Sequence, residues 1–437
     1  MKKNQKKIAI VGSGMSGIAA AYFLAKTGYE PEVLESEPYA GGRAQSIWLT
    51  DKMIDIGGKN IGRNYPLFRQ FVKDMGEHEF EFFGINSTRV REGNMKTIDS
   101  SKKIKSIYNF LTTVELSSFA KLLRLALMTK INPDNGYLDS AYFNKLSAKY
   151  DHQPITRYFK PKFVENILRT ITIRMCGTEP EEYYLGNFRS NVKMIGDQFE
   201  QLANGMHYLI KDFQKSCPVK FNTRVTGIIR EGNSVTGVLV DSEKGQEKLY
   251  YDGVVIATLA VISSEILADE FPQLSDELAK VRYNPVTLAV VRYNRNIFNP
   301  TVRAIAFDRT TALSNAGCYG VFDLNIVRYT FSGIKSTESI DENSEPSKVI
   351  VLGENSLNKY VNVSKNIRRD YVYKHFKYGL CCYSQYHYRL LERVRKILLA
   401  IPGLVVSGDY IRGAAIEACF RAGRDAAEAL DKKLSVN

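Results

Sequence analysis

Short apolar runs separated by glycine-rich and polar stretches predict a strand, a helix and a second strand at the start of the chain. The apolar run 8–11 ends at Gly12, and a second one ends at Glu35. The stretch 15–27 between them is predicted to form a helix. Residues 251–258 form a β-branched run bounded by glycine and polar residues, which indicates a buried core strand. Strands joined by a helix in this order are typical of α/β folds.

The glycine-rich turn after the first strand has the spacing of a dinucleotide-binding site. Gly12 allows the tight turn, Gly14 lets the backbone approach a pyrophosphate, and Gly17 lets the helix pack close to the strand. The helix directs its N-terminal N–H groups at the phosphates, and Glu35 can accept ribose hydroxyls. A glycine-rich turn that binds no ligand is the alternative interpretation. The predicted contacts are Gly12, Ser13, Gly14, Met15, Ser16, Gly17, Glu35 and Ser36.

Further motifs near both ends of the chain resemble those of one flavoprotein superfamily. Residues 36–44 contain Gly-Gly-Arg, residues 53–59 contain Gly-Gly-Lys, and residues 404–427 contain Gly-Asp followed by a helix start. With these motifs the chain resembles, from end to end, the FAD-dependent amine oxidase, protoporphyrinogen oxidase and phytoene desaturase superfamily. The resemblance implies FAD as the cofactor. It also implies an α/β fold, with a Rossmann-type FAD-binding domain like that of glutathione reductase, interleaved with an α+β substrate domain.

The resemblance assigns cofactor contacts to two further glycine-rich segments. The backbone at Gly42, Gly57 and Gly58 would run close to the flavin or its phosphates, because glycine leaves room for a close approach. Arg43 would supply a planar cation for phosphate oxygens.

The resemblance also assigns contacts near the C-terminus and in the middle of the chain. Asp409, expected to close a strand, would hydrogen-bond the ribityl chain, and capping the following helix is its alternative role. That helix is predicted from about 414 to 433. Ile416 would present its backbone N–H to a flavin carbonyl. Val225, which follows a segment resembling the Gly-Gly-Met motif of the superfamily, would contact the adenine through its backbone.

The positions of these motifs predict two interleaved domains. A chain of 437 residues exceeds one ordinary hydrophobic core. Residues 1–75, 200–265 and 390–437 are predicted to form the FAD-binding domain, and residues 76–199 and 266–389 the substrate-binding domain.

The net charge of +13 changes the set of expected partners. It is consistent with an acidic substrate, an acidic carrier protein or anionic lipid, although a lysine-rich solvated surface is the plainer interpretation. No nucleic-acid recognition motif accompanies the charge, so nucleic acid is not an expected partner. The six cysteines show no C-x-x-C spacing and indicate neither a metal site nor a disulfide framework. This cysteine usage favours a reducing cytoplasm. The basic first residues lack an apolar segment and a cleavage site, so no signal peptide is expected.

One amphipathic segment, residues 110–131, leaves peripheral membrane contact open. Its apolar residues near helical spacing are Leu111, Val114, Phe119, Leu122, Leu123, Ala126 and Leu127. Such a stripe can lie on a membrane surface or pack in the core of the substrate domain. No apolar stretch approaches the ~20 residues that span a bilayer.

Other positions distinguish branches of the superfamily. Typical amine oxidases carry a lysine on a substrate-domain strand, where this chain has Leu288 or Ala289, and an aromatic residue at the position of Ala415. The stretches 413–419 and 381–387 instead resemble the protoporphyrinogen-oxidase-like branch, with proline replaced by Cys381 and glycine by Tyr386 in the second stretch.

Three residues are the candidates for catalysis. Lys59, next to glycines that should approach the isoalloxazine, could stabilise anionic reduced flavin or anchor a substrate carboxylate, and its alternative is a solvated lysine. Tyr383 could lie at the flavin or substrate face or belong to the core. His387 could be a base near the substrate, and its alternative is a structural histidine. The pair Cys382-Tyr383 also resembles the pair that tethers FAD covalently in monoamine oxidases.

The sequence therefore predicts an FAD-dependent oxidoreductase. It would dehydrogenate or desaturate C–C or C–N bonds of a small or extended organic substrate, acidic or conjugated, by hydride transfer to flavin N5. O2 or a quinone would reoxidise the flavin, since a second, NAD(P)-binding motif is missing. A flavin amine or amino-acid oxidase and a non-redox flavin isomerase or mutase are the alternatives.

Overall fold

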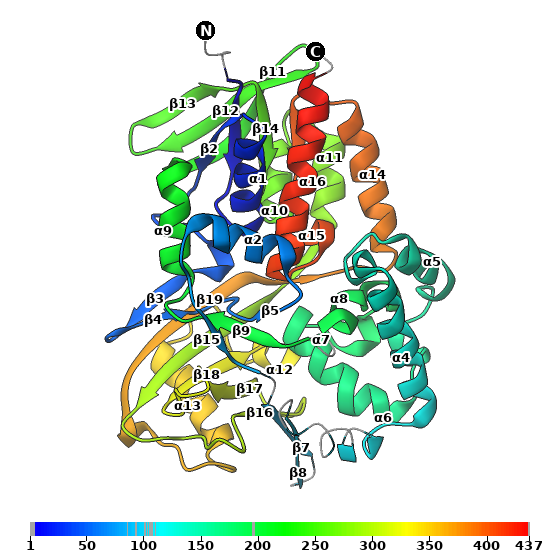
Figure 1. Ribbon diagram of the computed structural model, residues 1–437, viewed down its shortest axis with the longest axis vertical. Helices are drawn as coiled ribbons and strands as arrows, with labels where there is room; N and C mark the ends of the chain where they lie inside the picture. Colours follow the sequence, from blue (N-terminus) through cyan, green and yellow to red (C-terminus); the bar gives the residue numbers. More distant parts are fainter. Residues whose placement is uncertain are drawn as a thin grey trace.

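A five-stranded parallel sheet joins segments from the beginning, the middle and the end of the chain in the computed structural model (Figure 1). Its strands, in spatial order, are β10 (Val219–Lys220), β2 (Glu30–Leu34), β1 (Lys7–Val11), β14 (Gly253–Ile256) and β20 (Leu404–Val406). The structure describes residues 5–435 except 85, 92–93, 100–101, 103, 105–107, 110 and 195–196. Residues 1–4 of the basic start and Phe110 of the amphipathic segment therefore lie outside the described residues.

Two helices lie against this sheet and run side by side. They are α1 (Met15–Lys26) and α16 (Ile416–Ser435), and both chain ends lie at the top of Figure 1. Gly423 makes the close packing possible, because a Cβ there would lie 2.6 Å from both the Ala19 Cβ and the Ser16 carbonyl oxygen. Further helices around this sheet are α2 (Pro66–Met75), α9 (Met206–Ser216), α10 (Ala260–Leu267), α11 (Pro272–Ala279), α14 (His387–Leu399) and α15 (Asp409–Arg412).

The helix predicted over 15–27 and the strand predicted within 251–258 are confirmed, the second as β14. Two expectations near the C-terminus were wrong in detail. The strand before Asp409 ends at Val406, and Asp409 is the first residue of the short helix α15. The last helix begins at Ile416 rather than 414, because Gly413, with φ of 120°, turns the chain between α15 and α16.

A seven-stranded mixed sheet forms the lower left part of the molecule (Figure 1). Its strands, in spatial order, are β19 (Arg368–Cys382), β15 (Arg282–Tyr293), β18 (Ile326–Phe331), β17 (Leu313–Cys318), β16 (Ala304–Ala306), β7 (Asn86–Arg91) and β8 (Asn94–Asp99). One face packs into a hydrophobic cluster with α13 (Pro346–Leu357), and α12 (Ile334–Thr337) follows β18. The other face faces the parallel-sheet half of the molecule, because Leu288 and Val290 pack with Ile54 and Ile56.

Smaller sheets complete the fold. A hairpin pairs β3 (Ser46–Leu49) with β4 (Lys52–Asp55), and β9 (Phe199–Leu202) lies between β5 (Ile61–Gly62) and β6 (Phe80–Phe82). A three-stranded antiparallel sheet contains β11 (Thr223–Glu231), β12 (Ser234–Ser242) and β13 (Gly245–Tyr250).

Helices form the right-hand part of the molecule, beside the seven-stranded sheet (Figure 1). They are α4 (Leu116–Ile131), α5 (Ala141–Tyr150), α6 (Pro161–Phe163), a π-helical turn (Val164–Leu168), α7 (Arg169–Cys176) and α8 (Arg189–Met194). Among all described residues, no helix combines the length and the apolar character needed to cross a bilayer.

Candidate functional site

The turn between β1 and α1 has the geometry that the glycine spacing predicts. Gly12 adopts a φ of 95° and donates its N–H to the Leu34 carbonyl at 2.8 Å. A Cβ on Gly17 would lie 1.9 Å from the Gly12 carbonyl oxygen, whereas a Cβ on Gly14 would meet no atom within 4 Å. The first bond of the helix runs from the Ile18 N–H to the Gly14 carbonyl. The N–H groups of the preceding helical residues therefore have no partner within the helix and point into the open side of the turn.

Glu35 follows the end of β2 and is held beside this turn. Its carboxylate accepts hydrogen bonds from the Ser13 N–H at 2.8 Å, from the Ser13 hydroxyl at 2.5 Å and from the Glu37 N–H at 3.0 Å. The Ser36 hydroxyl lies 3.3 Å from the same carboxylate. The Thr223 N–H donates to the Glu35 carbonyl, which brings the start of β11, and so Val225, next to this corner. Glu35, Ser36 and Val225, which were predicted to surround the adenosine, are thus brought together.

A buried ion pair links two predicted cofactor residues from opposite ends of the chain. Arg43 Nη2 lies 2.8 Å from Asp409 Oδ2, and Arg43 Nη1 donates to the Gly379 carbonyl at 3.0 Å. The Tyr283 hydroxyl donates to Asp409 Oδ1 at 2.8 Å. Asp409 is buried, so its charge depends on these two partners. Tyr283 was not predicted, because nothing in its local sequence distinguishes it from other strand tyrosines.

The Gly57-Gly58 segment lies directly on the loop that carries Arg43. A Cβ on Gly57 would lie 1.7 Å from the Arg43 carbonyl oxygen, and the Gly58 N–H donates to the same oxygen at 3.0 Å. On the other side, a Cβ on Gly58 would meet no atom within 4 Å. Gly42 approaches the first turn in the same way, because its Cβ would lie 3.3 Å from the Gly14 Cα. The predicted glycines therefore form one continuous backbone surface with open space above Gly14 and Gly58.

Lys59 is buried at the end of this surface, and only 4% of the residue is exposed. Its Nζ donates to Gln201 Oε1 at 2.6 Å and to the Tyr319 carbonyl at 2.8 Å, and it lies 3.6 Å from the centre of the Phe83 ring. Burial, reinforced by the nearby positive charge of Arg328, lowers the pKa of Lys59 to about 7. The solvated lysine that was the alternative is therefore wrong for this position.

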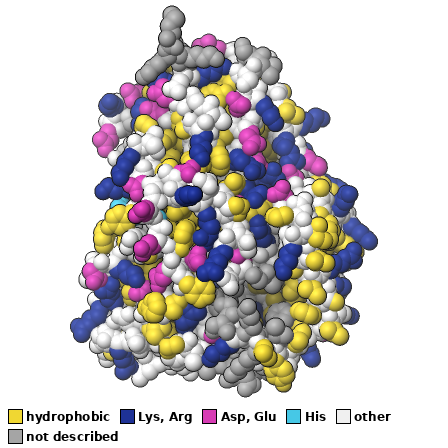
Figure 2. Space-filling model, in the orientation of Figure 1, with side chains coloured by type: hydrophobic (Ala, Val, Ile, Leu, Met, Phe, Trp, Pro, Cys, Tyr) yellow, Lys and Arg dark blue, Asp and Glu magenta, His cyan; other side chains and the backbone are white. Residues whose placement is uncertain are grey.

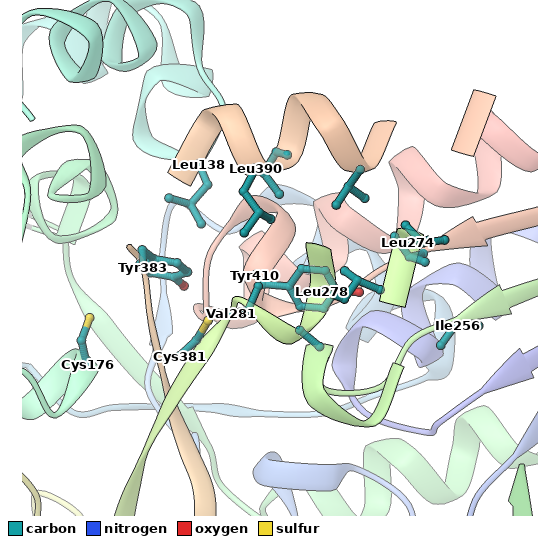
Figure 3. Close-up of a cluster of buried hydrophobic side chains, with 14 of the residues drawn as sticks. Leu138, Cys176, Ile256, Leu274, Leu278, Val281, Cys381, Tyr383, Leu390 and Tyr410 are labelled. Atoms are coloured by element: carbon teal, nitrogen blue, oxygen red, sulfur yellow. The ribbon is translucent and has the colours of Figure 1, made fainter. Parts of the chain in front are cut away.

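Tyr383 lies in a different environment, inside a hydrophobic cluster with Leu138, Leu390 and Tyr410 (Figure 3). His387 is buried beside it, with ring centres 5.2 Å apart. The Tyr383 hydroxyl donates to the Asp409 carbonyl at 3.1 Å, and His387 Nε2 lies 2.8 Å from the Tyr410 carbonyl. His387 begins α14 rather than continuing a strand, and burial lowers its pKa to about 4. Both side chains hold the backbone of α15, which carries Asp409, and these contacts are those of positioning residues.

The N-terminus of α16 faces the same edge of the parallel sheet as that of α1. Ile416 is the first residue of α16, so its N–H has no acceptor within the helix. Ala415 precedes it and leaves this helix end free of a large side chain. Two helix N-termini therefore meet at the carboxyl edge of the sheet, which is where parallel α/β folds bind ligands.

These residues fit an FAD. The open space above Gly14 lies at a helix N-terminus suited to phosphates, and the Glu35 carboxylate offers acceptors for ribose hydroxyls. The paired charges of Arg43 and Asp409 and the free N–H of Ile416 offer polar groups farther along the same surface. No cluster of histidine, cysteine and acidic residues suited to a metal ion occurs in the part of the chain that the structure describes.

Comparison with known proteins supports the assignment of FAD as the cofactor. A family model described as flavin-containing amine oxidoreductase matches residues 15–325. A protein from Dictyostelium discoideum, named a probable flavin-containing monoamine oxidase A, is 24% identical over 300 residues, which cover 62% of each chain. L-amino acid oxidase Bs29 from Bothriechis schlegelii is 26% identical over 306 residues, covering 65% of this chain and 59% of that protein. The chain thus matches less than two thirds of the length of these relatives.

The fold as a whole matches solved structures more completely. Cyclohexylamine oxidase from Brevibacterium oxydans IH-35A superimposes with a TM-score of 0.74 and 16% identity, covering 99% of this chain and 100% of that one. At this identity the likeness shows a shared fold, and it confirms the predicted α/β class with an FAD-binding part and a substrate part.

Proposed function

Because the chain belongs to the flavin-containing amine oxidoreductases, we propose that it dehydrogenates a C–N or C–C bond of a small organic substrate. FAD is its cofactor, and when bound it supplies the chemistry of the reaction by accepting a hydride at N5. The observation that carries the proposal is the backbone surface from Gly12 to Gly58, which ends at a buried lysine of lowered pKa.

Lys59 has the proton chemistry that such an oxidation needs. Removal of a hydride from a C–H bond leaves one proton on the substrate for the protein to take. With a pKa of about 7, the Lys59 amine is available as a base at neutral pH. Gln201 and the Tyr319 carbonyl fix the direction of Nζ. In the proposed reaction the substrate proton passes to Lys59 Nζ, and Tyr383 and His387 position the Asp409 segment.

The experiment that tests the cofactor and its mode of binding is an absorbance spectrum before and after acid precipitation. We expect flavin bands in the purified protein and free FAD in the supernatant. Cys382 pairs with Arg282 on β15 and lies 3.0 Å from the Thr178 hydroxyl, whereas the neighbouring Tyr283 is the residue that reaches Asp409. Since alternate strand residues face opposite sides, the Cys382 thiol points away from Asp409. Colour that stays with the pellet would contradict this, and a protein that binds no added FAD would defeat the proposal.

Two other reactions on the same fold are distinguished by their products. An amine or amino-acid oxidase releases ammonia or an aldehyde. The oxidases to which this chain is similar favour that alternative. Neither Leu288 nor Ala289, both buried on β15, offers the lysine that typical amine oxidases carry. An isomerase or mutase would consume no acceptor. O2 or a quinone is the proposed acceptor for the redox reactions, since the sequence carries no NAD(P) motif.

The proposed domain division follows the chain segments predicted from the sequence. Residues 1–75, 200–265 and 390–437 would form the FAD-binding domain, and residues 76–199 and 266–389 the substrate-binding domain. The parallel sheet draws its strands from the first set, and the seven-stranded sheet from the second, which supports this division.

The protein is proposed to be cytoplasmic and to contact a membrane peripherally. The proposed contact surface is the exposed face of α4. Leu116, Leu123, Leu127 and Ile131 follow one face of α4 and are 78%, 58%, 54% and 66% exposed. Leu122 and Leu125 point the other way into the core. Arg124 and Lys130 on the same helix are also exposed. Figure 2 shows hydrophobic side chains gathered at the right of the molecule, where α4 lies. An apolar face with cations suits an anionic lipid surface.

Vesicle sedimentation tests this contact. We expect binding to vesicles that contain phosphatidylserine and little binding to pure phosphatidylcholine. Leu123→Glu should weaken the binding about tenfold or more, because burying one leucine contributes about 1.5–3 kcal/mol. Leu399→Glu is the matched control, because Leu399 is an exposed leucine on α14. Equal binding of the wild type and Leu123→Glu would contradict the contact.

A further inference from the structure

The register of the seven-stranded sheet places two arginines on one face. Arg89 on β7 pairs with Ala306 on β16, Ala306 pairs with Asn315 on β17, and Asn315 pairs with Thr330 on β18. Paired residues share a face of the sheet, and Thr330 is two positions from Arg328. Arg89 and Arg328 therefore project from the same face.

That face is the one that meets the cofactor half of the molecule. Leu288 and Val290 lie on it, because they pair with Thr330 and Arg328 across β15 and β18, and they pack with Ile54 and Ile56. Ile56 directly precedes the segment that leads to Lys59. Arg328 is close enough for its charge to lower the pKa of Lys59.

The same face is open in its middle. Asn315, Arg328 and Thr330 are half-buried, although they lie on central strands, whereas Ala316 and Tyr329 on the opposite face are completely buried. Central strands become accessible in this way when they border a cavity rather than a packed layer.

A cavity of about 240 Å³ lies between α7 and the β7, β16 and β17 strands. Arg89 on β7 and Arg174 on α7 both line it. Arg174 remains accessible to solvent, yet the surrounding protein lowers its pKa, as expected for a side chain that projects into an internal cavity. Burial and the charge of Arg174 together lower the pKa of Arg89 to about 10.

These arginines lack carboxylate partners within the described part of the chain. Arg89 Nη1 is buried and has no hydrogen-bond partner, and neither Arg89, Arg174 nor Arg328 forms an ion pair there. Among the acids at the cavity wall, Glu165 and Glu179 both bind Arg169, and the exposed Asp308 accepts hydrogen bonds from the Thr310 N–H and hydroxyl. An unpaired guanidinium in such a place is costly unless a ligand neutralises it.

We propose that this cavity binds an oxyanion, a carboxylate or phosphate group of the substrate, between Arg89 and Arg174. The proposal rests on the proposed function and names the substrate class for it. Arginine is the side chain best suited to hold the two oxygens of such a group. Arg174 lies within electrostatic reach of both Arg89 and Arg328. Arg328 in turn lies within reach of Lys59. In this proposal the anionic group anchors one end of the substrate in the cavity, and the rest extends along the sheet face that carries Arg328, toward Lys59.

The same charges select against simple amines. An alkyl amine is a cation at neutral pH, so a site with Arg89, Arg174 and Arg328 repels it unless the molecule also carries an acid. The proposed substrates are thus acids, including amino acids and phosphate esters, rather than mono- or diamines.

Calorimetric titration of the FAD-loaded protein tests the anion site without turnover. The probes are succinate for a carboxylate, inorganic pyrophosphate for a phosphate, and 1,4-diaminobutane as a cation of similar length. We expect one of the two anions to bind and the diamine not to bind. The anion that binds identifies the group. Tight binding of the diamine, or binding of neither anion, would overturn the proposal.

Variants locate the site. Arg174→Met and Arg89→Met should each weaken anion binding about tenfold or more. The melting temperature should not fall, since Arg89 Nη1 is buried without a partner and the exposed Arg174 forms no ion pair among the described residues. Lys396→Met on the exposed side of α14 removes the same charge elsewhere and should bind as the wild type. Wild-type affinity in both arginine variants would refute the site. The flavin bands of each sample report on cofactor binding separately, so failure of the anion site and failure of the proposed function are distinguishable.

Discussion

Gly17→Ala is expected to destabilise the protein by about 3 kcal/mol or more and to abolish FAD binding. The added Cβ would lie 1.9 Å from the Gly12 carbonyl oxygen. That oxygen belongs to a backbone turn fixed by the bond from the Gly12 N–H to Leu34, so it cannot move aside as a flexible side chain can. The start of α1 must instead separate from β1, which disrupts the parallel sheet and the helix N-terminus together.

Gly14→Ala is the matched variant, because a Cβ there meets no protein atom within 4 Å and its φ of −67° suits alanine. The protein should therefore fold with a nearly unchanged melting temperature. The new methyl group occupies the space into which the dinucleotide is expected to fit, so FAD affinity should fall about tenfold or more. Thermal unfolding and the ratio of flavin to protein absorbance measure the two effects. If Gly17→Ala folds and binds FAD like the wild type, the close helix–strand packing is not required.

The first turn could be predicted residue by residue because its geometry is local. The spacing of Gly12, Gly14 and Gly17 fixes a tight turn, an open approach and a close helix contact, and each appears in the structure at its predicted position. The chemistry of Lys59 was less visible. A lysine after two glycines is also compatible with a solvated side chain, and only the packing of Phe83, Gln201 and Tyr319 around it decides the outcome.

The cationic cavity could not be predicted because it depends on strand pairing between distant segments. β7 lies beside β16, far away in the sequence, and only that pairing places Arg89 on the face that carries Arg328. The sole local signal is that Arg328 and Thr330 alternate with apolar residues along β18. This pattern does not reveal which face of the sheet is open. In the same way, the apolar pattern of α4 is compatible with two faces, and the tertiary fold buries Leu122 while leaving Leu123 exposed.

Lys59→Met is expected to slow substrate-driven flavin reduction about 100-fold without loss of FAD, because a positioned base contributes about 10²–10⁴-fold. The wild-type rate should rise with pH through about 7, as Lys59 loses its proton and becomes able to accept one. The variant should lack this rise. Stopped-flow reduction under anaerobic conditions measures both. Lys52→Met is the control, since Lys52 also lies near the Tyr319 ring but is paired with Asp323, and it should reduce at the wild-type rate.

The same residue should leave a signature in stability that is independent of turnover. The titratable groups near Lys59 are Arg328, Asp55, Cys318 and Glu81, and burial outweighs the acids, so the pKa falls from 10.5 to about 7. As the pH falls through that interval, the unfolded chain takes up the lysine proton while the folded protein does not. The wild type should therefore lose up to about 1.4 kcal/mol of stability per pH unit relative to Lys59→Met, and no more below pH 7. Parallel stability curves for the two proteins, together with wild-type reduction rates in the variant, would show that Lys59 is an ordinary lysine and has no part in the reaction.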